Sequence, residues 1–270
     1  MSGLACESST LSDLHVTDLG SGPDIVLLHG IGGSADTFAP QFADWPDRLR
    51  LLAWDAPGYA RSADPAAPLT LDEYADLVAE LIGDRCRRGA HLLGMSWGGV
   101  IATRVALRHP ELLRSLILGS STVGSGATEE GAAAMLARAD ELDADGATAF
   151  AAKRAPKVLS PQADPEKTQA VAAAMAASIR PAGYRSAAMA MADTDHTADL
   201  PRIDVPTLVL CGDLDTVTGE AASQVLAGGI PGAVFVTLRG AGHLANQERP
   251  EAFDAWAESF VQITERLRAS

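Results

Sequence analysis

The chain has 270 residues, a formal net charge of −14 and 47% hydrophobic residues, which is enough apolar content for one large domain or two small ones. The negative charge argues against a nucleic-acid-binding face. No run of apolar residues approaches the length of about 18 to 20 that would span a bilayer, so we expect no membrane partner either.

The N-terminal segment and the cysteines predict a cytoplasmic location. Met1 to Asp13 lack a basic stretch followed by a long apolar run, so no secretory signal is expected. The three cysteines, Cys6, Cys86 and Cys211, are odd in number and far apart, without metal-ligand spacing. Reduced structural thiols and no bound metal are the simplest interpretation.

Strand-like and helix-like segments alternate along most of the chain. Continuous apolar runs such as Ile25–Leu28 are typical of strands that are buried on both faces. Their alternation with helices predicts an α/β fold with a mostly parallel sheet and helices on both faces. In chain order we expect strands near 14–18, 24–29 and 50–55, a helix near 70–87, a strand near 90–95, a helix near 97–108, strands near 115–119 and 206–211, a helix near 219–228, a strand near 233–238 and a helix near 250–267.

One interruption divides this pattern. Strand-like runs vanish between Ser120 and Leu200, where segments rich in Ala and Met predict helices. We interpret residues 122–200 as a helical cap inserted into a core domain that is formed by residues 1–121 and 201–270. The cap helices are expected near 129–143, 146–154, 165–178 and 183–192.

Gly94-Met95-Ser96-Trp97-Gly98 is the most informative motif. It matches G-x-S-x-G, in which a serine sits on a sharp turn between a strand and a helix. The flanking glycines leave room for the tight backbone, and the turn exposes the hydroxyl to a base. Ser96 is therefore the candidate nucleophile.

The partners that a nucleophilic serine needs follow in the expected order of acid and then histidine. Gly212-Asp213-Leu214-Asp215 ends one buried strand, and His243 follows Gly242 after the next. Upstream, His29-Gly30-Ile31-Gly32-Gly33 ends a strand in a glycine-rich loop that can turn backbone N–H groups toward an oxyanion. We expect the N–H groups of Ile31 and Trp97 to form this oxyanion hole.

These motifs, together with Trp54–Ser62, resemble those of the α/β-hydrolase superfamily from about Asp24 to the last helix. Within it, the chain is most similar to the 3-oxoadipate enol-lactonase-like group of bacterial hydrolases, on His29–Ser34 and His243–Phe253. In this family the orienting acid usually falls three residues after the glycine, which selects Asp215 over Asp213. The resemblance implies a Ser-His-Asp hydrolase that needs no cofactor.

Trp97 stands where the family more often has Leu or Met, and its ring either lines the acyl pocket or packs in the core. The cap offers Met135, Met175, Met189 and Met191 as an apolar wall for the substrate, although methionines at helical spacing are often core residues. Arg154, Arg180 and Arg185 are candidates for binding a substrate carboxylate, with solvated surface arginines as the alternative.

The resulting prediction is a hydrolase that cleaves a carboxylic ester or lactone of a small organic molecule through an acyl-enzyme. A carbon–carbon bond hydrolase of a ring-cleavage diketone is the main alternative, although such relatives usually carry a proline in the oxyanion loop. A non-catalytic ligand-binding protein on the same fold is a second alternative. A monomer or homodimer is expected.

Overall fold

The computed structural model describes residues 10–269 and contains a seven-stranded sheet with the order β1-β3-β2-β4-β5-β6-β7. The first strand, β1, pairs antiparallel with β3, and the other neighbours pair in parallel. This sheet confirms the α/β fold that the alternating pattern predicts. The strands are β1 (Val16–Gly20), β2 (Asp24–Leu28), β3 (Arg50–Trp54), β4 (Ala90–Met95), β5 (Leu113–Gly119), β6 (Thr207–Gly212) and β7 (Val234–Leu238).

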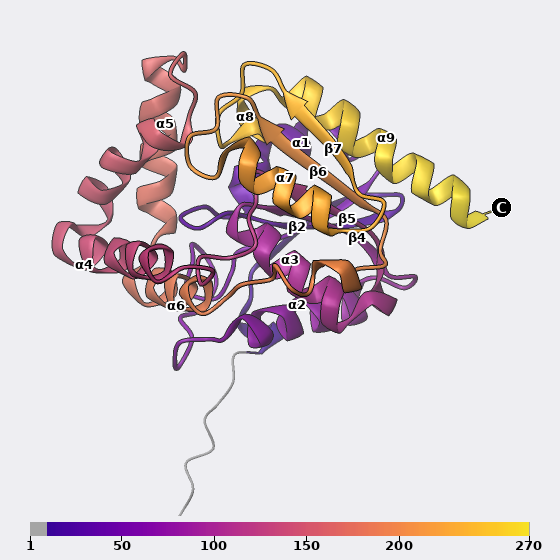
Figure 1. Cartoon of the computed structure of the whole chain (residues 1–270), viewed down its shortest axis with the longest axis horizontal. Helices are drawn as coiled ribbons and strands as arrows, with labels where there is room; N and C mark the ends of the chain where they lie inside the picture. The colour runs from indigo at the N-terminus through magenta and orange to yellow at the C-terminus, as the bar shows by residue number, and fades with distance from the viewer. Residues whose placement is uncertain (1–9, 270) are drawn as a thin grey trace, which may run out of the picture.

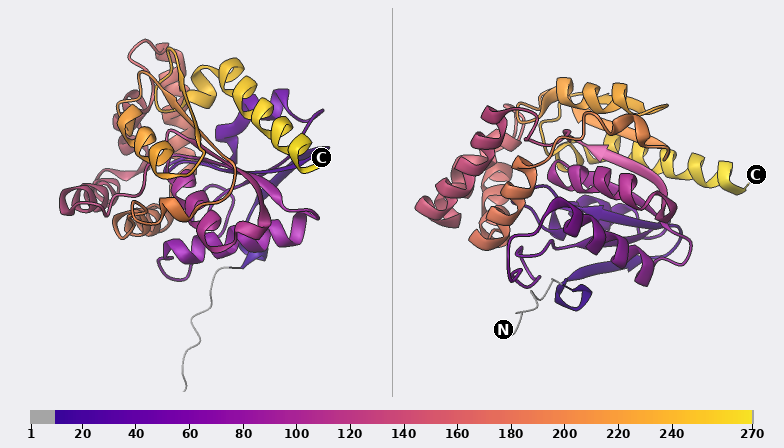
Figure 2. Two further views of the ribbon diagram at one scale, coloured as in Figure 1. Left: turned by 45° about the vertical axis from the view of Figure 1, so that its right-hand side comes forward. Right: turned by 60° about the horizontal axis from the view of Figure 1, so that its bottom comes forward.

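Helices cover both faces of this sheet, as Figures 1 and 2 show. The outer helices α1 and α9 pack on one face, and α2, α3 and α7 pack on the other. The bounds of the helices outside the segment between β5 and β6 are α1 (Ala39–Asp44), α2 (Leu71–Arg85), α3 (Trp97–Arg108), α7 (Gly219–Gly229), α8 (Ala245–Glu248) and α9 (Pro250–Ala269).

The strands explain why two cores form. Successive side chains of a strand point to opposite faces, so a continuous apolar strand supplies both layers. In β2, Ile25 and Leu27 belong to the core under α1 and α9, whereas Val26 and Leu28 belong to the core under α2 and α3. The central strands are thereby held from both sides, and their carboxyl ends are fixed in space.

Three helices lie between β5 and β6 in sequence, beyond the carboxyl ends of the strands at the left of Figure 1. They are α4 (Glu129–Val158), α5 (Pro165–Ser178) and α6 (Pro181–Ala192). Gly146, with φ 76°, breaks α4 into the two stretches that the sequence suggests. Both α5 and α6 pack against α4. The cap boundaries at 122 and 200 stay a prediction.

Cys86 and Cys211 are free and buried, whereas Cys6 and the first nine residues lie outside the described part of the chain. Within residues 10–269, none of the helices combines the length and the apolar character that crossing a bilayer requires.

Candidate active site

Ser96 occupies the turn between β4 and α3. Its backbone has φ 52° and ψ −115°, a conformation that residues other than glycine rarely adopt and that typically costs about 1–3 kcal/mol. The surrounding chain holds this turn: the Ser96 N–H donates to the Gly119 carbonyl at 2.8 Å, and Ser121 Oγ donates to the Ser96 carbonyl at 2.8 Å. The turn is therefore fixed from the neighbouring strand β5 as well as from its own flanks.

The glycines of the motif permit this turn because backbone atoms approach them closely. A Cβ added to Gly94 would lie 2.2 Å from the carbonyl oxygen of Gly98, and one added to Gly98 would lie 2.2 Å from the carbonyl oxygen of Leu28. Real Cβ atoms essentially never come within 3.0 Å of such neighbours. Any larger residue at either position would displace α3 from the sheet.

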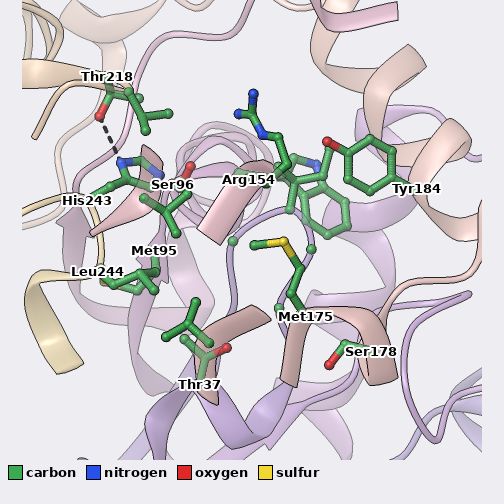
Figure 3. A pocket seen from close by; sticks show the side chains of 18 of the residues that line it. Thr37, Met95, Ser96, Arg154, Met175, Ser178, Tyr184, Thr218, His243 and Leu244 are labelled. Carbon is green, nitrogen blue, oxygen red and sulfur yellow. Dashed lines mark hydrogen bonds between the residues drawn. The ribbon is translucent and has the colours of Figure 1, made fainter. Parts of the chain in front are cut away.

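A cavity of about 460 Å³ opens where Ser96 meets the helices of the cap segment. It is lined by Ser96 and His243 from the sheet side and by residues of α4, α5 and α6 from the other side (Figure 3). The cavity therefore lies at the carboxyl ends of the strands, which is where open α/β sheets bind ligands.

His243 and Asp215 are in direct contact. His243 Nδ1 donates to Asp215 Oδ2 at 2.9 Å, although the two residues come from different loops, after β7 and β6. The Asp215 carboxylate is completely buried, and the His243 side chain is 7% exposed. Such a contact fixes the imidazole tautomer and leaves Nε2 free for another partner.

The pKa of Asp215 is lowered to about 2. Burial alone would raise this pKa, but the hydrogen bond and charge of His243 outweigh burial, with help from the Val217 N–H at 2.8 Å and the Thr218 hydroxyl at 2.8 Å. Asp215 is therefore a charged acceptor at neutral pH.

The other candidate acid, Asp213, makes a different contact. Its side chain is exposed and accepts a hydrogen bond from the Gly240 N–H at 2.6 Å. It thus ties the loop after β6 to the loop before His243. The structure brings Asp215, and not Asp213, to the imidazole.

Sequence reasoning missed Thr218, which lies beside both residues. Its hydroxyl is 2.8 Å from Asp215 Oδ2, 3.1 Å from the Ser120 carbonyl oxygen and 3.4 Å from His243 Nδ1. The signal was its position three residues after the acid, where a hydroxyl can turn back onto a loop carboxylate.

Ser96 and His243 line the same end of the cavity. In Figure 3 the Ser96 hydroxyl lies beside the His243 ring, on the side away from Thr218. No hydrogen bond between the two side chains is present in the described residues. Such contacts are often loose before a substrate binds.

The predicted oxyanion donors lie at the same end. Ile31 and Trp97 line the cavity next to Ser96. Trp97 is the first residue of α3, so its N–H has no partner within the helix. Neither of these two N–H groups donates to another group in residues 10–269. Both are therefore available to an oxygen atom of a ligand.

His29 holds the loop that carries Ile31. The Ala56 N–H donates to His29 Nε2 at 3.0 Å, so the proton of the neutral ring is on Nδ1, which donates to the Gly30 carbonyl at 2.9 Å. Burial lowers the pKa of His29, which keeps the ring neutral. This histidine is a structural part of the loop.

The Trp97 ring packs in the core. It is completely buried among the rings of Tyr74, Tyr59 and His29, at centroid distances of 5.1, 5.6 and 6.0 Å. Trp97 is also among the residues that line the cavity, so its buried ring lies in the core directly beside the cavity.

Three of the five cap residues predicted to bind substrate line the cavity: Met135, Met191 and Arg154. Met175 lines it as well.

The prediction was wrong for Met189 and Arg185, which are not among the lining residues. Met189 is 39% exposed, because it lies on a face of α6 that turns away from the cavity. Arg185 forms ion pairs with Asp140 and Asp143 at the outside of α4. Arg180 also pairs elsewhere, with Asp64 at 2.6 Å.

Several lining residues on α4, α5 and α6 were not expected from the sequence. Arg138 follows Met135 by one helical turn, so the spacing that selected Met135 could have found it. Aromatic and cationic side chains complete this wall: Arg138, Phe150, Lys167 and Tyr184. Within residues 10–269, no group of three or more His, Cys, Asp or Glu side chains is arranged to hold a metal ion.

Comparison with known proteins agrees with this architecture. Residues 25–256 match the profile of the Alpha/beta hydrolase family. The chain is 27% identical over 243 residues to 3-oxoadipate enol-lactonase 2 of Acinetobacter baylyi, a match that covers 89% of each chain. It is 32% identical over 266 residues to the polyketide synthase ThaQ of Burkholderia thailandensis, of which it spans only 12%.

Solved structures give the same result. The fold matches a thermophilic esterase from Thermogutta terrifontis with a TM-score of 0.86 and 26% identity, over 93% of both chains. The match extends through the segment between β5 and β6, because so little of the chain is left out.

Proposed function

This chain belongs to the alpha/beta hydrolase family, and we propose that it hydrolyses carboxylic esters or lactones of small organic molecules through Ser96, His243 and Asp215. The observation that carries the proposal is the 2.9 Å contact between His243 and the buried Asp215 at the end of the cavity that Ser96 lines. An oriented base next to an exposed hydroxyl on a strained turn is the arrangement that activates a serine.

In the proposed reaction, His243 Nε2 takes the proton of Ser96 as the serine oxygen attacks the substrate carbonyl. Asp215 stays ionised and stabilises the imidazolium, which fits its pKa of about 2. The imidazolium returns the proton to the leaving alkoxide, and an acyl-enzyme remains. His243 then activates a water molecule that releases the acid.

The N–H groups of Ile31 and Trp97 stabilise the tetrahedral oxyanion in this scheme. The position of Trp97 at the start of α3 adds the partial positive charge of the helix N-terminus. One such donor typically contributes about 10²- to 10³-fold in rate. Because both donors are backbone groups, the contribution of Ile31 depends on the shape of the loop that His29 holds, and that of Trp97 depends on the turn at Ser96.

The wall formed by α4, α5 and α6 selects the substrate in this proposal, and the resemblance to enol-lactonases and esterases supports an ester or lactone carbonyl. Most of that wall is apolar, from side chains such as Met135, Phe150 and Met175. Such a wall favours an acyl group with an apolar body.

The test is hydrolysis of p-nitrophenyl esters and of small lactones by the wild-type chain and by Ser96→Ala. We expect turnover of at least one class and a loss of about 10⁴-fold or more in kcat for the variant. An unfolding midpoint equal to that of the wild type shows that Ser96→Ala is folded. Ligand binding without turnover of any ester, lactone or ring-cleavage diketone would contradict the proposal.

A further inference from the structure

The wall of the cavity carries positive charge in a chain whose net charge is −14. Its lining residues include Arg138, Arg154 and Lys167, against one carboxylate, that of Asp36. This carboxylate already pairs with Arg61 at 3.1 Å. The cavity therefore has the opposite sign from the molecule as a whole.

Within the described part of the chain, Arg138 and Arg154 form no ion pair with the carboxylates around them. The charge of Glu141 reaches Arg138, but this carboxylate pairs with Lys153 at 3.3 Å. Neither arginine forms an ion pair or a hydrogen bond with any group in residues 10–269, and both are half-buried. Their neighbours on the cap helices differ: Arg185 pairs with Asp140 at 2.9 Å, and Lys153 pairs with Asp145 at 2.5 Å. The two arginines that line the cavity thus lack the ion pairs that these neighbours form.

The two guanidinium groups lie close enough to repel each other. Burial lowers the pKa of Arg138, and the charge of Arg154 lowers that pKa further. Two like charges that share a partly buried site are unfavourable unless an anion joins them. Tyr184, whose ring packs on Phe150 at 5.2 Å, adds a hydroxyl to the same part of the wall.

This charged part of the wall belongs to α4, whereas Ser96 and His243 line the cavity from the sheet side. In the view of Figure 3, Arg154 lies between Ser96 and Tyr184. Apolar side chains of the cap segment, including Met135, Phe150 and Met175, line the cavity as well. A ligand that fits all of these features has a carbonyl that reaches Ser96, an apolar body and an anionic group that faces α4.

We propose that Arg138 and Arg154 together bind an anionic group of the substrate, a carboxylate or a phosphate, on the α4 side of the cavity. The inference rests on the proposed function for the position of the scissile carbonyl. Guanidinium groups bind carboxylates and phosphates in bidentate geometry, through charge-assisted hydrogen bonds.

The experiment compares two esters of the same length, mono-p-nitrophenyl adipate and p-nitrophenyl hexanoate. The acyl chain of the adipate ester ends in a carboxylate, and that of the hexanoate ester ends in a methyl group. The measured quantity is the ratio of their kcat/KM values in the wild type, in Arg138→Gln, in Arg154→Gln and in Arg185→Gln. The last variant removes a cap arginine that lies outside the cavity and is the matched control.

We expect the wild type to prefer the adipate ester, and we expect the ratio to fall about tenfold or more in Arg138→Gln and in Arg154→Gln, the size of one lost charge-assisted contact. Arg185→Gln should keep the wild-type ratio. Arg138→Lys and Arg154→Lys keep the charge and should retain part of the preference, which separates an effect of charge from a misfolded cap. A ratio unchanged in both Gln variants would overturn the inference while leaving ester hydrolysis intact.

The type of anion is identified by how strongly added molecules inhibit the hydrolysis of p-nitrophenyl hexanoate. Adipate as the stronger inhibitor assigns a carboxylate, and hexyl phosphate as the stronger inhibitor assigns a phosphate, with uncharged hexan-1-ol as the control for the apolar chain. Equal weak inhibition by all three would count against an anion site. If no ester is turned over, the proposed function fails by itself. The anion site is then tested by direct binding of the same three molecules to the wild type and to Arg154→Gln.

Discussion

His243 Nδ1 lies 2.9 Å from Asp215 Oδ2, and this contact joins two loops whose residues are 28 positions apart in the sequence. Asp213, two residues before Asp215, instead accepts from the Gly240 N–H at 2.6 Å. The two acids of the same loop thus have separate roles: one contacts the imidazole, and the other fastens the loop.

Replacing each acid by its amide tests this division. Asp215→Asn should lower kcat by about 10³- to 10⁴-fold, because an amide does not hold the catalytic tautomer or stabilise the imidazolium. Asp213→Asn, the matched control in the same loop, should stay within a few-fold of the wild type. Steady-state kinetics with one ester measure both, and a reversed order would assign the acid to Asp213.

The lowered pKa of Asp215 also leads to a prediction about the stability of the protein at acid pH. Its folded pKa of about 2 lies below the ordinary aspartate value of 3.8. The contribution to the free energy of unfolding is therefore complete above about pH 4 and is lost as the pH falls toward 2. Urea unfolding between pH 5 and 2.5 should show a smaller acid-induced loss in Asp215→Asn than in the wild type. An equal loss in both would contradict this assignment.

Glu248 joins the loop of His243 to the cap segment. One carboxylate oxygen accepts from the Gly242 N–H at 2.8 Å, and the other accepts from the Ser160 N–H at 2.9 Å. Glu248→Gln places an amide NH₂ against one of these N–H groups, so we expect kcat to fall about tenfold while KM changes less, since one satisfied contact is lost. Glu251→Gln, at an exposed site nearby, is the control. Equal kinetics in both variants would show that Glu248 does not position the loop.

The raised pKa of Asp254 leads to a change of protein stability with pH that has the opposite sign. Burial raises its pKa to about 7, against the hydrogen bond from Gln41, and the nearby carboxylates of Asp44, Glu258 and Glu251 add to the rise. The folded state then binds more protons than the unfolded state, so stability falls as the pH rises from about 4 to 7. At pH 8, Asp254→Asn should therefore have a free energy of unfolding that is higher than that of the wild type by up to about 4 kcal/mol. It should also unfold at a higher temperature in a thermal scan. The gain in stability of the variant over the wild type should be larger at pH 8 than at pH 5. A smaller gain at pH 8 would contradict this.

The strain at Ser96 gives a comparison of two inactive variants. A protein with glycine at a given position is usually less stable than the same protein with alanine there, by about 0.5–1 kcal/mol in the free energy of unfolding. At φ 52° the order should reverse, because only glycine adopts this conformation without strain. Ser96→Gly should thus unfold at the same or a higher temperature than Ser96→Ala in a thermal scan. The usual order would mean that the turn relaxes when the hydroxyl is removed.

The sequence predicted the sheet and its helices well because their signals are local. Continuous apolar runs marked the strands, and a capping box marks the start of α2, where the Thr70 hydroxyl accepts from the Glu73 N–H at 3.2 Å. The helix α3 runs over the predicted residues 97–108. The short helices α1 and α8 were missed, since one turn of helix has too few residues for a periodic pattern.

The wall of the cavity was harder to predict because the cap helices are rich in alanine and have little difference between their faces. Without such a pattern, the sequence does not reveal which side of α6 faces the cavity. The sequence therefore pointed to Met189 and Arg185, whereas in the structure Arg138 and Tyr184 line the wall. Contacts between distant loops, such as those of Thr218 and Glu248, depend on the tertiary fold and leave no local signal.

The central claim is that Ser96 is the nucleophile that His243 activates, and stoichiometric labelling with diethyl p-nitrophenyl phosphate tests it directly. Attack by the serine oxygen on phosphorus would release one p-nitrophenolate and leave one diethylphosphoryl group per chain. We predict a single adduct on Ser96 by peptide mass spectrometry, loss of ester hydrolysis in step with labelling, and no adduct in Ser96→Ala or His243→Ala. A wild-type chain that hydrolyses esters but carries no adduct, or carries it on another residue, would contradict the account.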